Sequence, residues 1–185
     1  PEAEETASPR QKGYLARWAA LGLSLDVDTG SYELRKDEHV LFETFGARVS
    51  GTLKVYLKQR AREYQEGFWR DGALTISPRA VAERIVFWED FLHENPTFVP
   101  GKQVLKEMIK GLTRVLLRGV HNTPPFDPES HCLNEPFREA YHFLVQRTQS
   151  RVGNLVRRYV TILKANGFRE SETSQAFLDE VLPGD

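Results

Sequence analysis

The chain has 185 residues, of which 40% are apolar, and a formal net charge of −1. A chain of this length can bury about 70% of the surface that it exposes when unfolded, so it needs no disulfide or metal to hold a core. The composition excludes a wholly disordered chain, and a single cysteine, Cys132, excludes an internal disulfide. No run of about 20 apolar residues occurs, which predicts that this chain has no transmembrane segment.

The start of the chain predicts a flexible linker over residues 1–11, followed by one all-α domain over residues 12–185. Residues 1–9 are acidic and rich in small side chains, as linkers are. Because the chain starts at Pro1 instead of Met, we expect it to follow a cleaved signal, a lipid anchor or a tag. The compartment stays open between the cytoplasm and an exported or tethered location.

The first 66 residues predict helices on either side of an irregular segment. Residues 14–23 form a short apolar-rich helix candidate. Residues 25–32 alternate briefly and carry turn residues, which predicts a loop or a minor hairpin. From residue 37 to residue 66 apolar residues recur at helical spacing, and Gly46 and Gly51 are positioned to divide this segment into two helices.

Start and stop signals define the helices of the second half. Ser77 and Pro78 form a helix start, with an N-cap hydroxyl and a proline in the first turn. Asn95-Pro96 ends that helix, and Gly119 is a natural C-cap for the next one. The expected helices span residues 78–95, 101–119, 135–147, 152–165 and 172–182, with a proline-rich connection over residues 121–130. No strand pattern competes with them, so the predicted fold class is all-α.

Two stretches of this half echo each other. An aromatic residue followed by apolar residues three and four positions later occurs at Trp88 and again at Tyr141, and a second helix follows each after a short polar break. The apolar residues of the two second helices are Leu105, Ile109 and Leu112, and Leu155, Tyr159 and Ile162. The echo predicts antiparallel helix hairpins stacked as a small helical repeat or bundle. Residues 78–168 resemble tetratricopeptide-like helical hairpin repeat proteins, although the period and signature of that family are absent.

Charge is unevenly distributed along the chain. Residues 101–169 hold twelve basic and five acidic side chains, whereas residues 170–185 hold no basic and five acidic ones. Five cations lie four residues apart on one predicted helix, and we call them the basic row: Lys102, Lys106, Lys110, Arg114 and Arg118. Steps of four residues turn about 40° past a full circle, so the row winds slowly around its helix. Arg151 and Arg158 add positive charge on the second helix of the next hairpin.

Three interpretations of the basic row stay open. It is a solvated helix face, a docking surface for the acidic tail, or a binding surface for a partner. The acids of the tail are Glu170, Glu172, Asp179 and Glu180. Phosphates would bind the row with salt-dependent affinity, but aromatic residues for base stacking are scarce beside it. Trp69, which follows a predicted helix end, is a candidate anchor for a protein partner.

The proline-rich connection offers possible metal ligands without a recognisable metal pattern. They are His121, Asp127, Glu129, His131 and Cys132. No spacing among them matches a zinc site, and the neighbouring prolines restrict how they converge. The chain also lacks a phosphate-binding glycine loop and the GxSxG and HExxH motifs. We therefore expect no metal and no cofactor.

The sequence thus predicts a non-enzymatic protein–protein interaction or scaffold module, part of a larger or membrane-tethered assembly. Its expected partner is a protein or peptide. The alternative is binding of a polyanion such as nucleic acid through the basic row. A small metal-dependent enzyme that uses the connection comes third.

Overall fold

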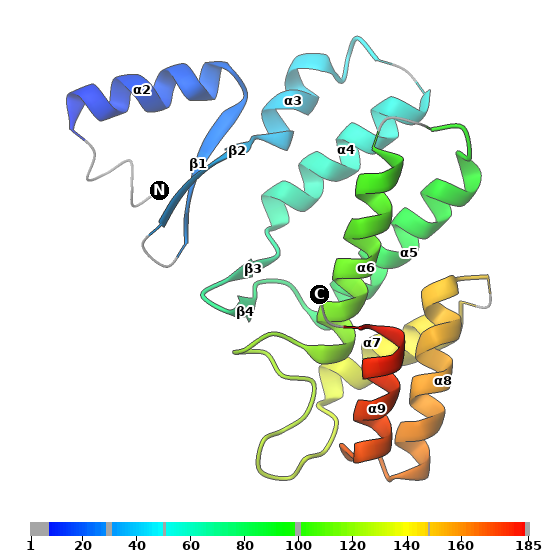
Figure 1. Ribbon diagram of the computed structural model, residues 1–185. Helices are drawn as coiled ribbons and strands as arrows, with labels where there is room; N and C mark the ends of the chain where they lie inside the picture. The colour runs from blue at the N-terminus through cyan, green and yellow to red at the C-terminus, as the bar shows by residue number, and fades with distance from the viewer. Residues whose placement is uncertain (1–7, 29–30, 50, 99–100, 148, 184–185) are drawn as a thin grey trace. The chain divides into compact units, whose positions relative to one another are not determined.

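A computed structural model describes residues 8–28, 31–49, 51–98, 101–147 and 149–183. In this part of the chain the fold is mostly helical, which confirms the predicted all-α class (Figure 1). The chain divides into two compact units, Pro1–Asp71 and Gly72–Asp185, where the sequence predicts a single domain from residue 12 on. Residues 1–7 of the expected linker lie outside the described residues.

The first unit contains helices and a β-hairpin. Its elements are α2 (Pro9–Ala20), β1 (Leu23–Asp28), β2 (Ser31–Lys36), α3 (Glu38–Phe45), α4 (Gly51–Glu66) and β3 (Trp69–Arg70). Helix α2 begins inside the expected linker because Ser8 and Gln11 form a capping box and Pro9 occupies the first turn. Residues 9–11 of the expected linker are therefore helical.

Strands β1 and β2 pair as a β-hairpin, which is one of the two alternatives that the sequence predicts for this segment. Its strands are antiparallel, with Leu23 opposite Lys36 and Leu25 opposite Leu34. The next two helices, α3 and α4, pack against each other, and they are separated at Gly46 and Gly51 as predicted.

The first unit buries charge and exposes apolar side chains. Glu38 is buried and accepts a hydrogen bond of 3.2 Å from Nη2 of Arg60. Glu63 is also buried and accepts one of 2.8 Å from Gln59. The large apolar side chains that it exposes are Tyr14, Leu21, Leu34, Phe45, Leu53, Val55, Tyr64 and Trp69.

The second unit consists of two helix hairpins and a final short helix. Its elements are β4 (Ala73–Leu74), α5 (Pro78–Glu94), α6 (Lys102–Arg118), α7 (Glu135–Val145), α8 (Arg151–Ala165) and α9 (Glu172–Val181). These bounds agree closely with the predicted helices. Helix α5 packs against both α6 and α7, α7 packs against α8, and α9 packs against α8 (Figure 1).

The core of this unit is rich in aromatic side chains. Trp88 on α5, Tyr141 on α7 and Tyr159 on α8 are almost completely buried. The ring of Tyr141 lies edge-on to that of Tyr159 at 5.9 Å, and Tyr159 stacks on Phe177 of α9 at 5.8 Å. A continuous set of rings therefore joins α7, α8 and α9.

Hydrogen bonds from a tyrosine side chain and from a loop also connect the helices of the second unit. The hydroxyl of Tyr141 donates a hydrogen bond of 3.0 Å to the carbonyl of Leu116, in the last turn of α6. The connection between the hairpins is anchored to the α8–α9 loop, because the backbone N–H of Leu133 donates to the carbonyl of Phe168 at 2.8 Å. Pro125, Phe126 and Leu133 of this connection are buried. None of the described helices is long and apolar enough to cross a bilayer.

Candidate interaction surface on α6 and α9

The basic row winds across α6 because that helix is regular from Lys102 to Arg118. Its inner side buries Leu105, Leu112 and Leu116. Gly119 ends it with a positive φ of 72° and donates its N–H to the carbonyl of Val115. A row that advances by four residues drifts around the helix relative to this apolar side. Its members therefore have different surroundings.

The first three cations of the row have mostly solvent around them. Lys102 is half-buried, and its Nζ donates a hydrogen bond of 3.0 Å to the carbonyl of Pro96. Lys106 and Lys110 are exposed. Within the residues that the structure describes, no carboxylate lies in ion-pair distance of these two ammonium groups. They form a pair of exposed cations one turn apart.

The last two cations of the row hold the C-terminal end of the chain. Nη2 of Arg118 lies 2.8 Å from Oδ1 of Asp179 and 3.4 Å from the carbonyl of Leu182. Nη2 of Arg114 donates a hydrogen bond of 2.9 Å to the carbonyl of Pro183. Docking of the acidic tail, one of the three interpretations that the sequence leaves open, is thus observed here for Asp179.

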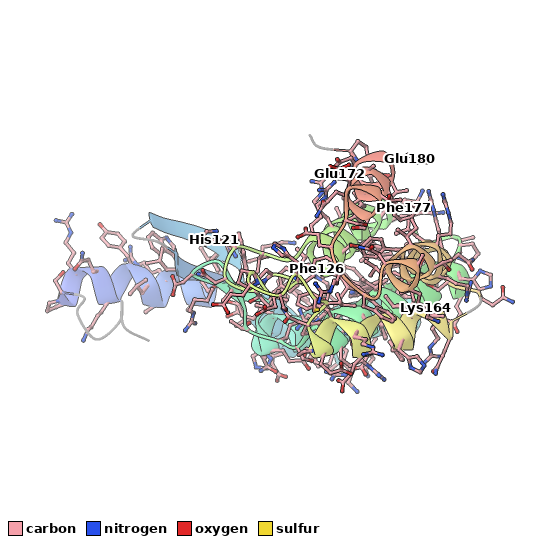
Figure 2. All side chains as sticks on the ribbon, turned by 90° about the horizontal axis from the view of Figure 1, so that it is seen from below. His121, Phe126, Lys164, Glu172, Phe177 and Glu180 are labelled. Carbon is pink, nitrogen blue, oxygen red and sulfur yellow. The ribbon has the colours of Figure 1, made fainter. Side chains whose placement is uncertain are left out.

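Helix α9 is an amphipathic helix seated between α6 and α8. Ser171 and Ser174 form a capping box at its start. Its apolar side places Phe177 on Tyr159, and the guanidinium of Arg158 lies 5.1 Å from the centre of the Phe177 ring. Figure 2 shows Phe177 on the side of α9 toward α8, with Glu172 and Glu180 away from it. The seated helix therefore combines an apolar side with acidic flanks.

The hydroxyl of Tyr159 lies beneath α9 without a partner. The side chain is completely buried, and no described residue forms a hydrogen bond with this oxygen. Burial and the negative charge of Glu170 raise the pKa of Tyr159, while the positive charge of Arg118 opposes the rise.

The remaining predicted site residues lie elsewhere. Arg151 is exposed in the first turn of α8. Arg158, in contrast, takes part in the surface through its contact with Phe177. Trp69 is 52% exposed on β3 and belongs to the first unit. Within the second unit the structure thus brings together Arg114, Arg118 and Arg158 around α9.

Two of the possible ligands of the connection, Asp127 and His131, have side-chain partners nearby. Oδ1 of Asp127 accepts hydrogen bonds of 2.7 Å from both the backbone N–H and the hydroxyl of Ser130. These bonds lower the pKa of the Asp127 carboxyl, which is typical of a carboxylate that closes a turn. Nδ1 of His131 lies 3.7 Å from the carboxylate of Glu170. The described residues contain no cluster of three or more groups suited to a metal ion.

Tyr159 and Phe177 are parts of this surface that the sequence analysis did not assign to it. Phe177, Leu178, Val181 and Leu182 recur at helical spacing, and the acidic residues stand beside them. This pattern indicates an amphipathic acidic helix, but it does not indicate which part of the chain the helix packs against.

Comparison with known proteins finds no family model, no curated protein and no solved structure that is significantly similar to this chain.

Proposed function

We propose that this chain is a non-enzymatic protein–protein interaction module, part of a larger or tethered assembly, that binds an acidic protein segment on α6. The observation that carries the proposal is the docking of Asp179 on Arg118. It is an example, within one chain, of an acidic helix bound to the basic row.

Lys106 and Lys110 are the part of the row that remains open to a partner. Both are exposed, and both project from a helix whose apolar side is fixed in the core. Carboxylates of a bound segment would pair with them at the rim of the interface, where charges mainly set specificity and the rate of association. The partner is therefore expected to carry acidic side chains that face these two lysines.

A polyanion such as nucleic acid is the second candidate, and the same two lysines favour it. Docking of the tail on Arg114 and Arg118 leaves few cations of the row for phosphates. Each phosphate neutralised adds to affinity and to its salt dependence. A site with two or three available cations would therefore bind nucleic acid weakly.

The test is a pull-down from native lysate with the immobilised chain, with and without nuclease, read by mass spectrometry. Three versions of the chain are compared: the unmodified chain, Lys106→Glu with Lys110→Glu, and Lys54→Glu with Lys58→Glu. The last pair is a matched control, since both lysines are exposed and one turn apart on α4. We expect a defined protein that persists after nuclease and is lost only with the changes on α6. Recovery of nuclease-sensitive material alone would assign the row to a polyanion instead.

A further inference from the structure

We propose that the acidic outer side of α9 in one copy of the chain binds the first half of the basic row in a second copy. The acidic outer side consists of Glu172 and Glu180, and the first half of the row consists of Lys102, Lys106 and Lys110. This inference rests on the proposed function, because it names the acidic segment that α6 binds.

The three lysines are available to carboxylates of another molecule. Lys106 and Lys110 are exposed. Nζ of Lys102 donates one hydrogen bond to a backbone carbonyl, and an ammonium group has three donors, so it can also pair with a carboxylate. Glu107, the acidic residue of α6, accepts a hydrogen bond of 2.9 Å from Gln103. Among the residues that the structure describes, no carboxylate lies within ion-pair distance of these lysines.

Glu172 and Glu180 are available in the same way. Both are exposed, and Figure 2 shows them on the side of α9 away from Phe177. No cation in the described part of the chain forms an ion pair with either carboxylate. Phe177 is buried, and Asp179 pairs with Arg118 of its own chain. Helix α9 can therefore present two unpaired acids to a second molecule while it stays in place.

The spacing of the two sets of charges matches. The three lysines follow one another in steps of four residues along α6, and the two glutamates are separated by two such steps along α9. A rise of 1.5 Å per residue places the outer members of each set about 12 Å apart. Rows of four-residue steps on two helices align when the helices cross at about −50°, the commonest packing angle in globular proteins. Ala176, midway between the glutamates, is small and exposed and leaves room for the Lys106 side chain.

A second copy is the occupant that the charge distribution favours. Residues 101–169 hold twelve basic and five acidic side chains, and residues 170–185 hold five acidic and no basic ones. Every copy therefore carries both surfaces of the contact. The net charge of the chain is only −1, so two copies do not repel each other strongly as whole molecules. The ion pair of Asp179 with Arg118 is an example, within one copy, of a carboxylate of α9 bound to the basic row.

The contact is expected to be weak and sensitive to salt. Its ion pairs are exposed, and exposed ion pairs contribute little to affinity because water and salt screen them. Association therefore requires a high local concentration, such as that of several chains held in one assembly.

The experiment measures sedimentation of the purified full chain at concentrations from about 0.01 to about 0.5 mM, a range suited to weak association. We expect the average mass to rise with concentration at an ionic strength of about 20 mM, where charges are little screened. An ionic strength of about 300 mM should weaken the association at least about fivefold, because the screening length is shorter.

Charge reversal on either surface is expected to abolish the association. The row variant carries Lys106→Glu with Lys110→Glu, and the acid variant carries Glu172→Lys with Glu180→Lys. Two controls change the net charge by the same amounts at exposed positions outside both surfaces, and they should associate as the unmodified chain does. The controls are Lys54→Glu with Lys58→Glu and Glu129→Lys with Glu139→Lys.

A mixture of the row variant and the acid variant provides a measurement that does not depend on loss alone. The row variant keeps the acidic side of α9, and the acid variant keeps the lysines of α6. The mixture should therefore associate although neither variant does so by itself. Restored association would also show that both variants are folded.

The outcomes that overturn the inference are distinct from those that affect the proposed function. A chain that stays monomeric over the whole range, association that does not depend on salt, an equal loss in the controls, or a mixture that stays monomeric would each overturn the second copy as occupant. A monomeric purified chain, together with a nuclease-resistant partner that depends on Lys106 and Lys110 in the pull-down, would end this inference and leave the proposed function standing. Failure of both measurements would end both proposals.

Discussion

The carboxylate of Glu89, on α5, accepts a hydrogen bond of 3.1 Å from the backbone N–H of Val152 in the first turn of α8. The hydroxyl of Ser150, the N-cap residue of α8, donates to the same carboxylate. One side chain of the first hairpin thus satisfies donors at the start of a helix in the second, where the helix dipole also favours a negative charge.

Glu89→Ala is expected to reduce the free energy of unfolding by about 1–3 kcal/mol, because it leaves these donors without a charged acceptor. The measurement is urea denaturation followed by circular dichroism. Asp90→Ala is the control, since this carboxylate is exposed one residue further along α5 and its removal should change stability by less than about 0.5 kcal/mol. Equal losses for the two variants would show that Glu89 does not act through α8.

We expect removal of the hydroxyl to change the free energy of unfolding differently at the two buried tyrosines, Tyr141 and Tyr159. Tyr141 satisfies the Leu116 carbonyl, so Tyr141→Phe should cost about 1–2 kcal/mol of unfolding free energy. Tyr159 has no partner for its hydroxyl among the described residues, so Tyr159→Phe should leave stability unchanged or raise it by about 1 kcal/mol. Denaturation of both variants under one set of conditions provides the test. A larger loss for Tyr159→Phe than for Tyr141→Phe would contradict it.

Stability is expected to fall at alkaline pH because of the same two side chains. Burial raises the pKa of Tyr141 and of Tyr159 above the ordinary value of 10.0. Above this pH the unfolded chain therefore binds fewer protons than the folded chain. The free energy of unfolding is unaffected by these groups below pH 10.0, and it decreases by about 1.4 kcal/mol per pH unit and tyrosine above it.

Denaturation curves from about pH 8 to about pH 11.5 measure this slope. The double variant Tyr141→Phe with Tyr159→Phe should lose stability more gradually over the upper part of that range. Identical slopes for the variant and the unmodified chain would mean that other groups cause the alkaline loss.

We expect alanine to have opposite effects on stability at Gly111, inside α6, and at Gly119, the C-cap residue of that helix. A Cβ at Gly111 meets no atom within 4 Å, so Gly111→Ala should stabilise the helix by about 0.5–1 kcal/mol through its higher helix propensity. Gly119 has a φ of +72°, and a Cβ there would lie 2.5 Å from Cδ of Pro125 and 2.7 Å from the carbonyl of Thr123. Gly119→Ala should therefore cost more than about 2 kcal/mol. Thermal denaturation of the two variants distinguishes these outcomes.

The helices of the second unit are predictable because their signals are local. Ser77 and Pro78 start α5, and the Ser77 hydroxyl accepts from the N–H of Ala80 at 3.1 Å, as an N-cap does. Gly119 ends α6 in a conformation that favours glycine. Such signals depend only on neighbouring residues, so the helix bounds can be inferred without knowledge of the packing.

Only part of the candidate surface can be predicted from the sequence, because its contacts join residues that lie far apart in the chain. The basic row and the acidic tail are visible in the sequence, but the pairing of Arg118 with Asp179 joins residues 61 positions apart. The contact of Glu89 with Val152 spans 63 positions and leaves no local signal. The capping box of Ser8 and Gln11 is a local signal for the start of α2 at Pro9. The prediction of a linker over residues 1–11 depends on composition alone, which does not contain this signal.

The connection between the two hairpins has a consequence for manipulation of the chain. With three prolines between residues 124 and 128 it has the composition of a spacer. However, Phe126 and Leu133 lie in the interior, and the N–H of Asn134 donates to the carbonyl of Pro125 at 2.8 Å. The connection therefore contributes buried side chains to the second unit, as its helices do. The parts of the connection around Phe126 and Leu133 are therefore poor positions for an inserted tag or for dividing the gene into two fragments, whereas residues 128–131 are exposed and are where a protease is expected to cut.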